Sequence, residues 1–345
     1  MTKIFEIKDK VFRFCAEYET YLRYVYKFVV ALTLFCVLNN SIGFMEKIST
    51  FPVALLLALI CCLLPQNVTI LVAGVLVVLN LYALSLEVAL VAFLIFAVIF
   101  LLYFRFSPQD GMLFLLTPIM FKLGIPYILP IGTGLLRKVY SVSAVVCGTI
   151  AFYFVDGIYQ NMTTLGSTSV GADGAETSKI SVTISQLLTN KEMFIVVGIF
   201  TLSAIVVYVI RRLSVDNAWK IALLSGTMIQ ISGLFAGYLL FNITDKTAGM
   251  IIGNIIAMVL SFGLEFLFMD LDYSRTERVQ FEDDDYYYFV KAVPKKMVTS
   301  SEKTVKMFGD TGFGERRSAR KKESMQEDSR KLIAEELDID EDLLD

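Results

Sequence analysis

Long runs of apolar residues, separated by short polar segments, fill most of positions 28 to 269. A helix crosses the apolar core of a bilayer, about 30 Å thick, with roughly 20 predominantly apolar residues. Eight runs approach this length, although the second is shorter than the rest. They predict eight membrane-spanning helices, at about 28–45, 51–64, 68–85, 88–104, 140–157, 193–210, 219–241 and 248–269. The fold class is therefore an all-α polytopic membrane protein.

A further apolar stretch, 112–136, differs from these runs because proline and glycine interrupt it. Proline removes a backbone donor and glycine loosens a helix, so neither half spans a bilayer comfortably. Irregular backbone at membrane depth is tolerated where it is buried in protein or lines a watery cavity, and transporters bind substrates at such broken helices. We expect either a re-entrant element lining a substrate or ion path, or a kinked pair of short helices packed for structural reasons. The candidate residues are Pro118, Lys122, Gly124, Pro126, Pro130, Gly132 and Gly134.

The basic residues sort to one side when the predicted spans alternate in direction. The basic segments are 1–27, 105, 137–138, 211–220 and the C-terminal tail. The long polar loop at 158–191, by contrast, carries two lysines. Positively charged loops concentrate on the cytoplasmic side of a membrane. Both termini are therefore expected in the cytoplasm and the 158–191 loop outside it, provided that 112–136 crosses an even number of times or dips in and returns.

The polar ends of the chain predict three cytoplasmic segments. Apolar residues recur every three or four positions in 1–27, which favours an amphipathic arm on the inner leaflet or a partner-binding helix. In 270–299, two short strands around an acidic turn predict a hairpin that needs a partner strand, another subunit or the membrane surface. The charged segment 300–345 predicts a disordered tail. A basic cluster in it, expected to attract anionic lipid, comprises Arg316, Arg317, Arg320, Lys321 and Lys322.

Few ionisable or amide side chains lie within the predicted spans, where such groups are costly and usually functional. The candidates are Asp156, Gln230, Asn254 and Glu265. The two carboxylates lie near span ends and can reach water, whereas the amides form interhelical hydrogen bonds or line a polar path. Small residues four positions apart also allow close packing of helices. These packing candidates are Gly233, Gly237, Gly249 and Gly253.

The composition of the chain excludes several classes of enzyme and metal site. Of the 345 residues, 56% are hydrophobic and 19% charged, against about 45–50% and 25% in soluble proteins. Histidine is absent, which excludes Ser-His-Asp catalysis and His-based zinc sites. The sequence also lacks a G-x-x-x-x-G-K-[ST] phosphate loop, so it has no Walker ATPase of its own. No cofactor, metal site or nucleic-acid partner is predicted, and an embedded enzyme is the third alternative.

Two stretches, LLTPIMFKLGIPYILPIGTGLLRKVYS and QFEDDDYYYFVKAVPKK, resemble an uncharacterised family of bacterial multi-pass membrane proteins. Some members of that family are described as permease components of ABC transporters. The resemblance covers most of the chain and implies a bacterial plasma-membrane setting. It transfers no catalytic or binding residues.

Two functions follow from these observations. The first is a transport-related, permease-like subunit, in which 112–136 lines the path and a separate ATPase or an ion gradient supplies the energy. The second is a non-transporting scaffold or regulator that recruits partners through its C-terminal tail. A polar cavity at the membrane midplane near Pro118–Gly134 would favour transport, whereas a dry region sealed there by apolar side chains would remove the transport hypothesis.

Overall fold

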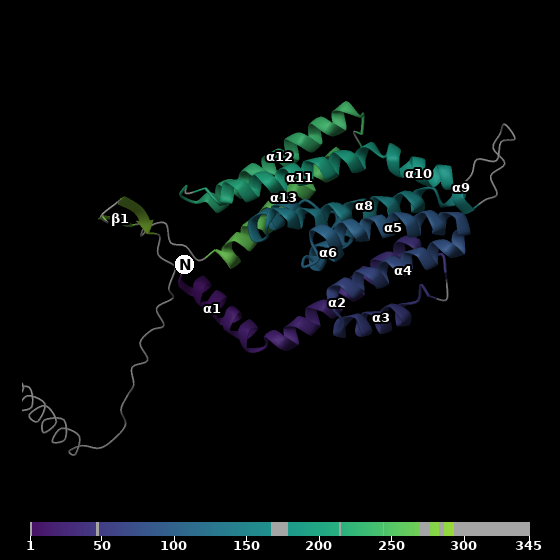
Figure 1. Ribbon diagram of the computed structural model, residues 1–345, viewed down its shortest axis with the longest axis horizontal. Helices are drawn as coiled ribbons and strands as arrows, with labels where there is room; N and C mark the ends of the chain where they lie inside the picture. Colours follow the sequence, from purple (N-terminus) through teal and green to yellow (C-terminus); the bar gives the residue numbers. More distant parts are fainter. Residues whose placement is uncertain are drawn as a thin grey trace, which may run out of the picture. The chain divides into compact units, whose positions relative to one another are not determined.

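The computed structural model describes residues 2–45, 48–166, 179–213, 215–243, 245–269, 277–282 and 286–292. In this part of the chain, seven helices are long and apolar enough to cross a membrane. They are α2 (Glu19–Ile42), α4 (Gln66–Leu84), α5 (Leu86–Phe106), α8 (Val142–Gln160), α11 (Lys191–Arg211), α12 (Ala218–Leu240) and α13 (Thr247–Phe268). The chain is thus an all-α, multi-pass membrane protein, and its long helices run side by side (Figure 1).

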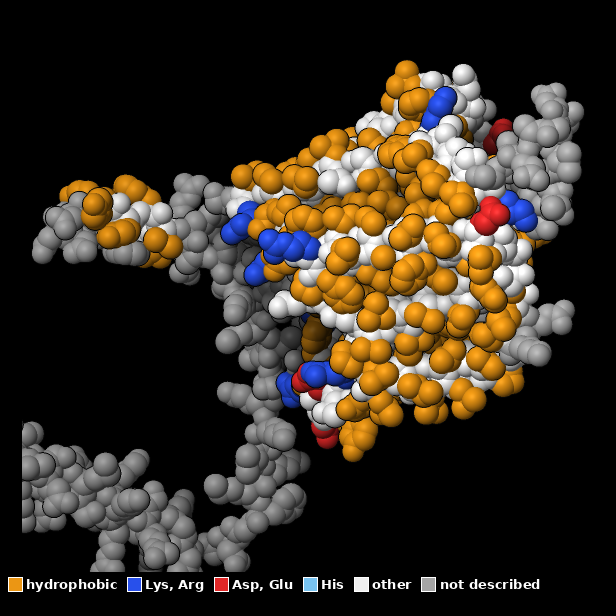
Figure 2. Space-filling view, turned by 45° about the vertical axis from the view of Figure 1, so that its right-hand side comes forward, with side chains coloured by type: hydrophobic (Ala, Val, Ile, Leu, Met, Phe, Trp, Pro, Cys, Tyr) orange, Lys and Arg blue, Asp and Glu red, His pale blue; other side chains and the backbone are white. Residues whose placement is uncertain are grey.

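Hydrophobic side chains cover the flank of the helix bundle, while charged side chains gather toward its margins (Figure 2). Large apolar residues on this surface are far from buried, since Leu56, Phe93 and Leu240 are 60%, 61% and 78% exposed. Soluble monomers rarely expose a continuous apolar surface of this kind. The flank therefore matches a surface that faces lipid.

The shorter helices supply the connections and one departure from the expected spans. They are α1 (Thr2–Glu17), α3 (Phe51–Leu63), α6 (Gly111–Lys122), α7 (Ile128–Leu136), α9 (Met162–Gly166) and α10 (Lys179–Thr189). The expected second span, 51–64, forms α3, which runs between opposite ends of the bundle although its 13 residues extend about 20 Å, less than the thickness of the bilayer core. Pro52 lies in its first turn and Pro65 caps α4, so prolines limit it at both ends.

Hydrogen bonds and an ion pair gather one set of helix ends at the same face of the bundle. They join Lys27 to Leu64, Tyr103 to Asn67, Arg137 to Asp110 and Arg211 to Arg137. We call this face the basic end, because it carries basic residues such as Arg137 and Arg211, which the charge pattern assigns to the cytoplasmic side. At the opposite end, the side-chain oxygen of Asn80 accepts hydrogen bonds from the Met45 amide and the Ser49 hydroxyl.

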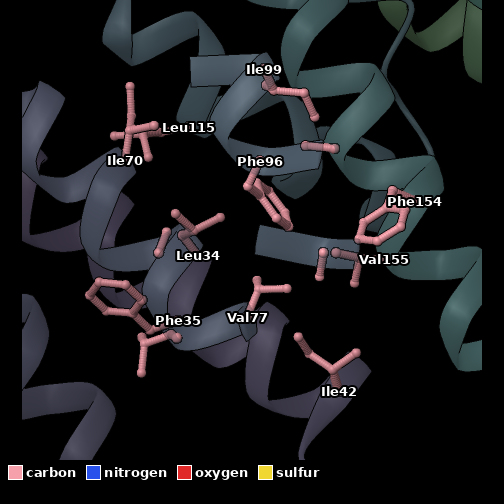
Figure 3. Close-up of a cluster of buried hydrophobic side chains, with 14 of the residues drawn as sticks. Leu34, Phe35, Ile42, Ile70, Val77, Phe96, Ile99, Leu115, Phe154 and Val155 are labelled. Atoms are coloured by element: carbon pink, nitrogen blue, oxygen red, sulfur yellow. The ribbon is translucent and has the colours of Figure 1, made fainter. Parts of the chain in front are cut away.

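Helix α8 divides the bundle into an N-terminal half (α2–α6) and a C-terminal half (α7 and α11–α13). Cys147, Ala151, Phe154 and Ile158 recur at helical spacing and pack into the core of the N-terminal half. Figure 3 shows part of this core, in which the labelled side chains are apolar. On another face of α8, Tyr153 packs into the core of the C-terminal half.

The predicted polar loop at 158–191 contains the helices α9 and α10. α10 packs against α5 and α8, with Thr183 buried and the apolar Val182 and Leu187 against the core. The apolar Ile180, Ile184, Leu187 and Leu188 recur at helical spacing among its Ser, Thr and Gln residues, so a short amphipathic helix was readable in this polar loop. Residues 167–178 of the same loop lie outside the described residues.

The described parts of the two terminal segments follow the predicted pattern. The arm forms α1, and the Lys8 ammonium donates to the carbonyls of Phe266 and Met269 at 2.8 and 3.3 Å. Strands β1 (Glu277–Glu282) and β2 (Tyr287–Ala292) confirm the hairpin, pairing antiparallel. The acidic residues 283–285, the basic cluster and the rest of 300–345 lie outside the described residues.

Candidate functional site

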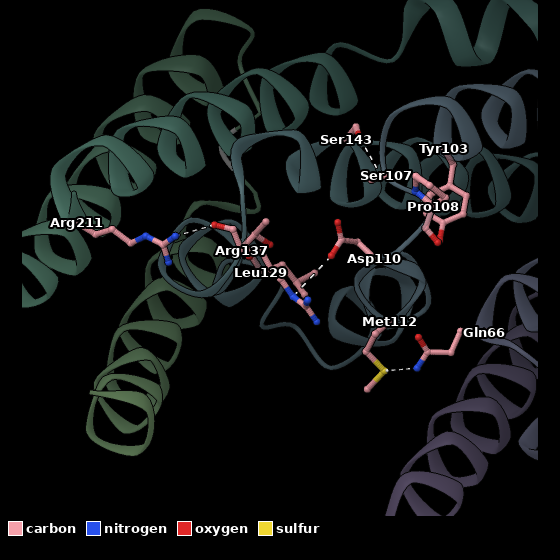
Figure 4. Close-up of polar contacts among 11 residues, drawn as sticks. Gln66, Tyr103, Ser107, Pro108, Asp110, Met112, Leu129, Arg137, Ser143 and Arg211 are labelled. Atoms are coloured by element: carbon pink, nitrogen blue, oxygen red, sulfur yellow. Dashed lines mark hydrogen bonds and ion pairs between the residues drawn. The ribbon is translucent and has the colours of Figure 1, made fainter. Parts of the chain in front are cut away.

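The interrupted segment 112–136 folds into a hairpin of two short helices whose outer ends both lie at the basic end. α6 leaves the basic end at Gly111, and α7 returns to it at Leu136. The Asp110 carboxylate lies 3.6 Å from the Arg137 Nε and joins the two ends (Figure 4). The Asp110 side chain is 4% exposed and that of Arg137 55%, so the pair sits at the edge of the bundle.

Arg211 of α11 fastens the returning end of the hairpin (Figure 4). Its guanidinium donates to the carbonyls of Leu135 and Arg137, the second at 3.0 Å. The last carbonyls of a helix have no partner within the helix and need one from elsewhere. Arg211 therefore caps α7 and binds the hairpin to the C-terminal half.

The tip of the hairpin is a glycine cap followed by a proline. The Gly124 amide donates to the Phe121 carbonyl at 3.1 Å, and the Ile125 amide donates to the Met120 carbonyl at 3.0 Å. These two bonds form a Schellman motif, which places its glycine in the left-handed region. Gly124 has a φ of +75°, and Pro126 then prevents the helix from resuming at once. The chain is thereby forced to turn back.

A cavity of about 340 Å³ opens beyond this tip, on the side away from the basic end. Gly124, Pro126 and Tyr127 of the hairpin line it. Its other walls come from α8, the start of α11, the end of α12 and the start of α13. Aromatic and charged side chains from five segments thus meet where the hairpin ends.

Glu192 ties three walls of this cavity together. Its carboxylate accepts a hydrogen bond from the Tyr153 hydroxyl at 3.2 Å and lies 2.7 Å from the Lys246 ammonium. The residue lies in the first turn of α11, where a negative charge is favoured by the helix dipole. The side chain of Asn190 caps the same helix by accepting from the Met193 amide at 3.0 Å. The helix dipole and the Asn190 cap at the start of α11 therefore hold the Glu192 carboxylate in place.

A second polar cavity of about 240 Å³ adjoins the first, and Tyr153, Asp156, Glu192 and Lys246 line both. Asp156 accepts a hydrogen bond from the Gln160 side chain at 2.7 Å. The two cavities together form a polar entrance that ends at the hairpin tip.

Lys122 lies on the other side of the hairpin from this entrance. It borders a narrow apolar cavity of about 50 Å³ in the N-terminal half, which Pro118 and Asp156 also line. Among the sequence candidates, Gly124, Pro126, Asp156 and Gly249 therefore meet at the polar cavity, whereas Pro118 and Lys122 do not line it.

The remaining candidates of the hairpin pack within the C-terminal half. Pro130 is buried in α7. A Cβ added at Gly134 would lie 2.8 Å from Val207, so α7 approaches α11 closely there. At Gly132 it would make an ordinary contact of 3.6 Å with Leu264.

The buried amides and Glu265 lie deeper in the C-terminal half. The Gln230 amide donates to the Ser203 hydroxyl at 3.0 Å, and the Asn254 amide donates to the Met250 carbonyl at 2.9 Å. The side-chain oxygen of each amide has no hydrogen-bond partner among the described residues. Glu265 is 5% exposed, so it is buried within the bundle and does not extend to water as expected.

The four packing glycines divide into two kinds. Cβ atoms added at Gly233 and Gly237 would lie 2.6 Å from isoleucine side chains of α11, and one at Gly253 would lie 2.6 Å from the Tyr127 ring. These three glycines mark close approaches. Gly249 differs from the expectation, because an added Cβ would meet no described atom within 4 Å and the residue borders the cavity.

Sequence reasoning did not single out the residues that give the cavity its chemistry. They are Tyr127, Tyr153, Glu192, Tyr238 and Lys246. The charged members lie just outside the apolar runs, and the tyrosines lie inside them as ordinary large side chains. The available signal was the tyrosine content of the later apolar segments beside acidic span ends.

No protein-family model matches the chain, and neither a curated protein nor a solved structure matches it. The resemblance to bacterial permease-like membrane proteins thus stays a prediction, and the functional argument rests on the geometry of the cavity.

Proposed function

We propose that the chain is a transport-related, permease-like membrane protein whose solute site is the cavity at the hairpin tip. The main support for this proposal is a polar cavity of about 340 Å³, which is lined by the interrupted backbone at Gly124–Tyr127. Small-molecule sites commonly have volumes of about 300–1,000 Å³. Broken helices that end at a binding cavity are a recurring device of secondary transporters.

The orientation follows from the charge pattern. With the basic end toward the cytoplasm of a bacterial cell, the cavity opens to the outside and the hairpin is re-entrant from the inside. Both termini then lie in the cytoplasm. A separate ATPase or an ion gradient supplies the energy, since the sequence has no phosphate loop.

An apolar barrier separates the cavity from the basic end. Ile131, Leu135, Val207, Ala222 and Leu223 form a cluster in which the exposed fraction of each side chain is zero. In this proposal, the conformation with this barrier is open on the cavity side and closed on the other. Transport requires this barrier, built from α7, α11 and α12, to open in turn.

The scaffold function has one specific observation in its favour. The hairpin β1–β2 exposes aromatic side chains, with Tyr286 67% and Phe289 78% exposed. A two-stranded sheet alone is marginally stable in water, so a partner strand or surface would stabilise it. Recruitment through this hairpin is the alternative against which transport is tested.

Cysteine accessibility distinguishes the two functions. In a background without the five native cysteines, Gly249→Cys reports on the cavity and Ser203→Cys on the barrier, about 10 Å further along α11 than Val196. Ser203 is fully buried, and cysteine is close to serine in size. Leu202→Cys is the matched control, because Leu202 is the neighbour of Ser203 in the chain and its side chain is 49% exposed on the flank.

We expect a charged, membrane-impermeant thiol reagent to modify Gly249→Cys from the cavity side. The same reagent should modify Ser203→Cys from the basic-end side, because transport opens the barrier there, and should spare Leu202→Cys in lipid. If Ser203→Cys is as unreactive as Leu202→Cys from both sides while Gly249→Cys reacts, the cavity does not connect to the other side of the membrane. The transport proposal then fails.

A further inference from the structure

The charges around the cavity do not balance. Three carboxylates line it, from Asp156, Glu192 and Asp245, against the one ammonium of Lys246, which gives a formal charge of −2. The nearby Lys191 is turned to another partner, since its ammonium lies 5.2 Å from the centre of the Phe241 ring. A cavity whose walls carry a net charge of one sign raises the local concentration of ligands of the opposite sign.

Aromatic walls accompany this negative charge. Tyr127, Tyr153 and Tyr238 line the cavity and are 9%, 7% and 3% exposed, so packing holds their rings in place. Tyr127 is held edge-on against Phe200, with ring centres 6.1 Å apart. The faces of such rings attract organic cations, and cages of aromatic residues recognise quaternary ammonium groups.

The carboxylates are also too dispersed for a compact metal site. Among the described residues, no three His, Cys, Asp or Glu side chains are grouped so that they could hold a metal ion. Spread charge around an aromatic cavity of about 340 Å³ suits a cation with a hydrocarbon body better than a bare ion.

We propose that the cavity binds a small organic cation, with its ammonium group among the three tyrosines and near Glu192. This inference rests on the proposed function, since it names the solute of the same site. Lys246 is the intramolecular stand-in for that cation. Its ammonium forms an ion pair with the Glu192 carboxylate at 2.7 Å. Its side chain is 55% exposed and lies at the mouth of the cavity, on the connection between α12 and α13.

The exchange of one cation for another gives the site its mechanism. An arriving ammonium group replaces Lys246 at Glu192, so the carboxylate keeps a cationic partner throughout. Lys246 then returns to water, which costs little because it is already half exposed. A carboxylate-bearing ligand would instead meet Asp156, Glu192 and Asp245, and like charges in a shared site repel.

Three probes of one shape and different charge test the proposal on the full chain in lipid nanodiscs. They are choline, its neutral carbon analogue 3,3-dimethylbutan-1-ol, and the anion 3,3-dimethylbutanoate. The readout is the midpoint of thermal unfolding against probe concentration, since a ligand that binds the folded state raises it. We expect choline to raise the midpoint and the other two probes to leave it unchanged.

Substitutions then locate the binding site. Glu192→Gln, which keeps a hydrogen-bond acceptor for Tyr153, and Tyr127→Leu should each weaken choline binding about ten-fold. Tyr82→Leu is the control, because Tyr82 is 59% exposed on the flank of α4 and should change nothing. Asp156→Asn serves as a second charge variant if Glu192→Gln fails to fold.

The outcomes separate this inference from the proposed function. Equal or tighter binding of the neutral or anionic probe, no response to choline up to its solubility limit, or unchanged choline binding in both charge variants would overturn the cation assignment. Choline binding together with an unreactive Ser203→Cys would keep the cation site and remove transport. A reactive Ser203→Cys without choline binding would do the reverse.

Discussion

The two halves of the bundle pack against different faces of α8, and the difference between them locates the site. In the N-terminal half, the long helices α2, α4 and α5 lie beside the shorter α3 and α6, and the space among them is a narrow apolar cavity of about 50 Å³. Where α6 of the N-terminal half turns into α7 of the C-terminal half, the hairpin stops partway, and about 340 Å³ of partly polar space lies beyond its tip, bordered by α8 and α11–α13. A hole of this size arises where a helix ends early, because continuous helices fill the space between them.

The same comparison explains the composition of each half. Side chains in the middle of long helices face other long helices, so Phe96 and Phe154 of the N-terminal half pack edge to face, 5.9 Å apart. The cavity, by contrast, is bordered by helix starts and ends, where charged residues such as Glu192 and Lys246 are found. An interrupted helix thus brings polar helix ends to an interior surface.

The largest expected effect tests whether the N-terminal half is purely structural. Phe96→Ala removes a ring that is 5% exposed and should destabilise the protein by about 3 kcal/mol, because buried Phe→Ala changes leave a cavity. Unfolding in detergent measures this change. Reactivity of Gly249→Cys should stay the same, since the polar cavity lies on another face of α8.

The control for that prediction is on the same helix. Phe93 is 61% exposed on the flank, so Phe93→Ala should leave stability nearly unchanged. If Phe96→Ala abolishes labelling of Gly249→Cys while the protein stays folded, the two halves are coupled. The claim that the N-terminal half is purely structural would then be wrong.

A smaller effect is expected where the hairpin is fastened at the basic end. Arg211→Gln leaves the Leu135 and Arg137 carbonyls without their donor, which should cost about 1–3 kcal/mol. Arg212→Gln is its neighbour-matched control, because the Arg212 guanidinium bonds to the exposed-side Tyr208 hydroxyl one turn away. Both are read by chemical unfolding, and equal losses in the two variants would show that Arg211 has no special role.

The smallest effect concerns the hairpin tip. Gly124→Ala should cost about 1–2 kcal/mol, because a residue with a Cβ is strained at a φ of +75°. Gly198→Ala, in the helical α11 with no described atom within 4 Å of an added Cβ, should instead stabilise by about 0.5–1 kcal/mol. Opposite signs in thermal unfolding support the glycine cap, and a neutral or stabilising Gly124→Ala would remove it.

The apolar pattern predicted most of the helices, because lipid surrounds them and a helix that faces lipid must be apolar along its length. It placed the second run, 51–64, to within one residue of α3, because Pro65 directly after the run marks its end in the sequence. The hairpin at 112–136 was predictable as an interruption, because proline and glycine act locally. Its two outcomes were not separable from sequence, since the pairing of Asp110 with Arg137 is a contact between distant residues.

The cavity itself was only half predictable for the same reason. Gly124, Pro126 and Asp156 stood out by residue type in an apolar setting. Tyr127, Tyr153 and Tyr238 did not, because nothing local shows that the hairpin tip, α8 and α12 bring these rings to one space. Glu192 and Lys246 lie 54 positions apart, so their ion pair exists through the fold alone.

Sidedness of the hairpin tests the central claim most directly. Gln109→Cys and Lys138→Cys, both at exposed positions flanking α6 and α7, are placed singly in the cysteine-free chain and labelled with an impermeant maleimide in sealed vesicles of known orientation. Both cysteines should react from the same side, and Gly249→Cys should react from the other. Labelling of Gln109→Cys and Lys138→Cys from opposite sides would show that 112–136 crosses the membrane, and it would contradict the account.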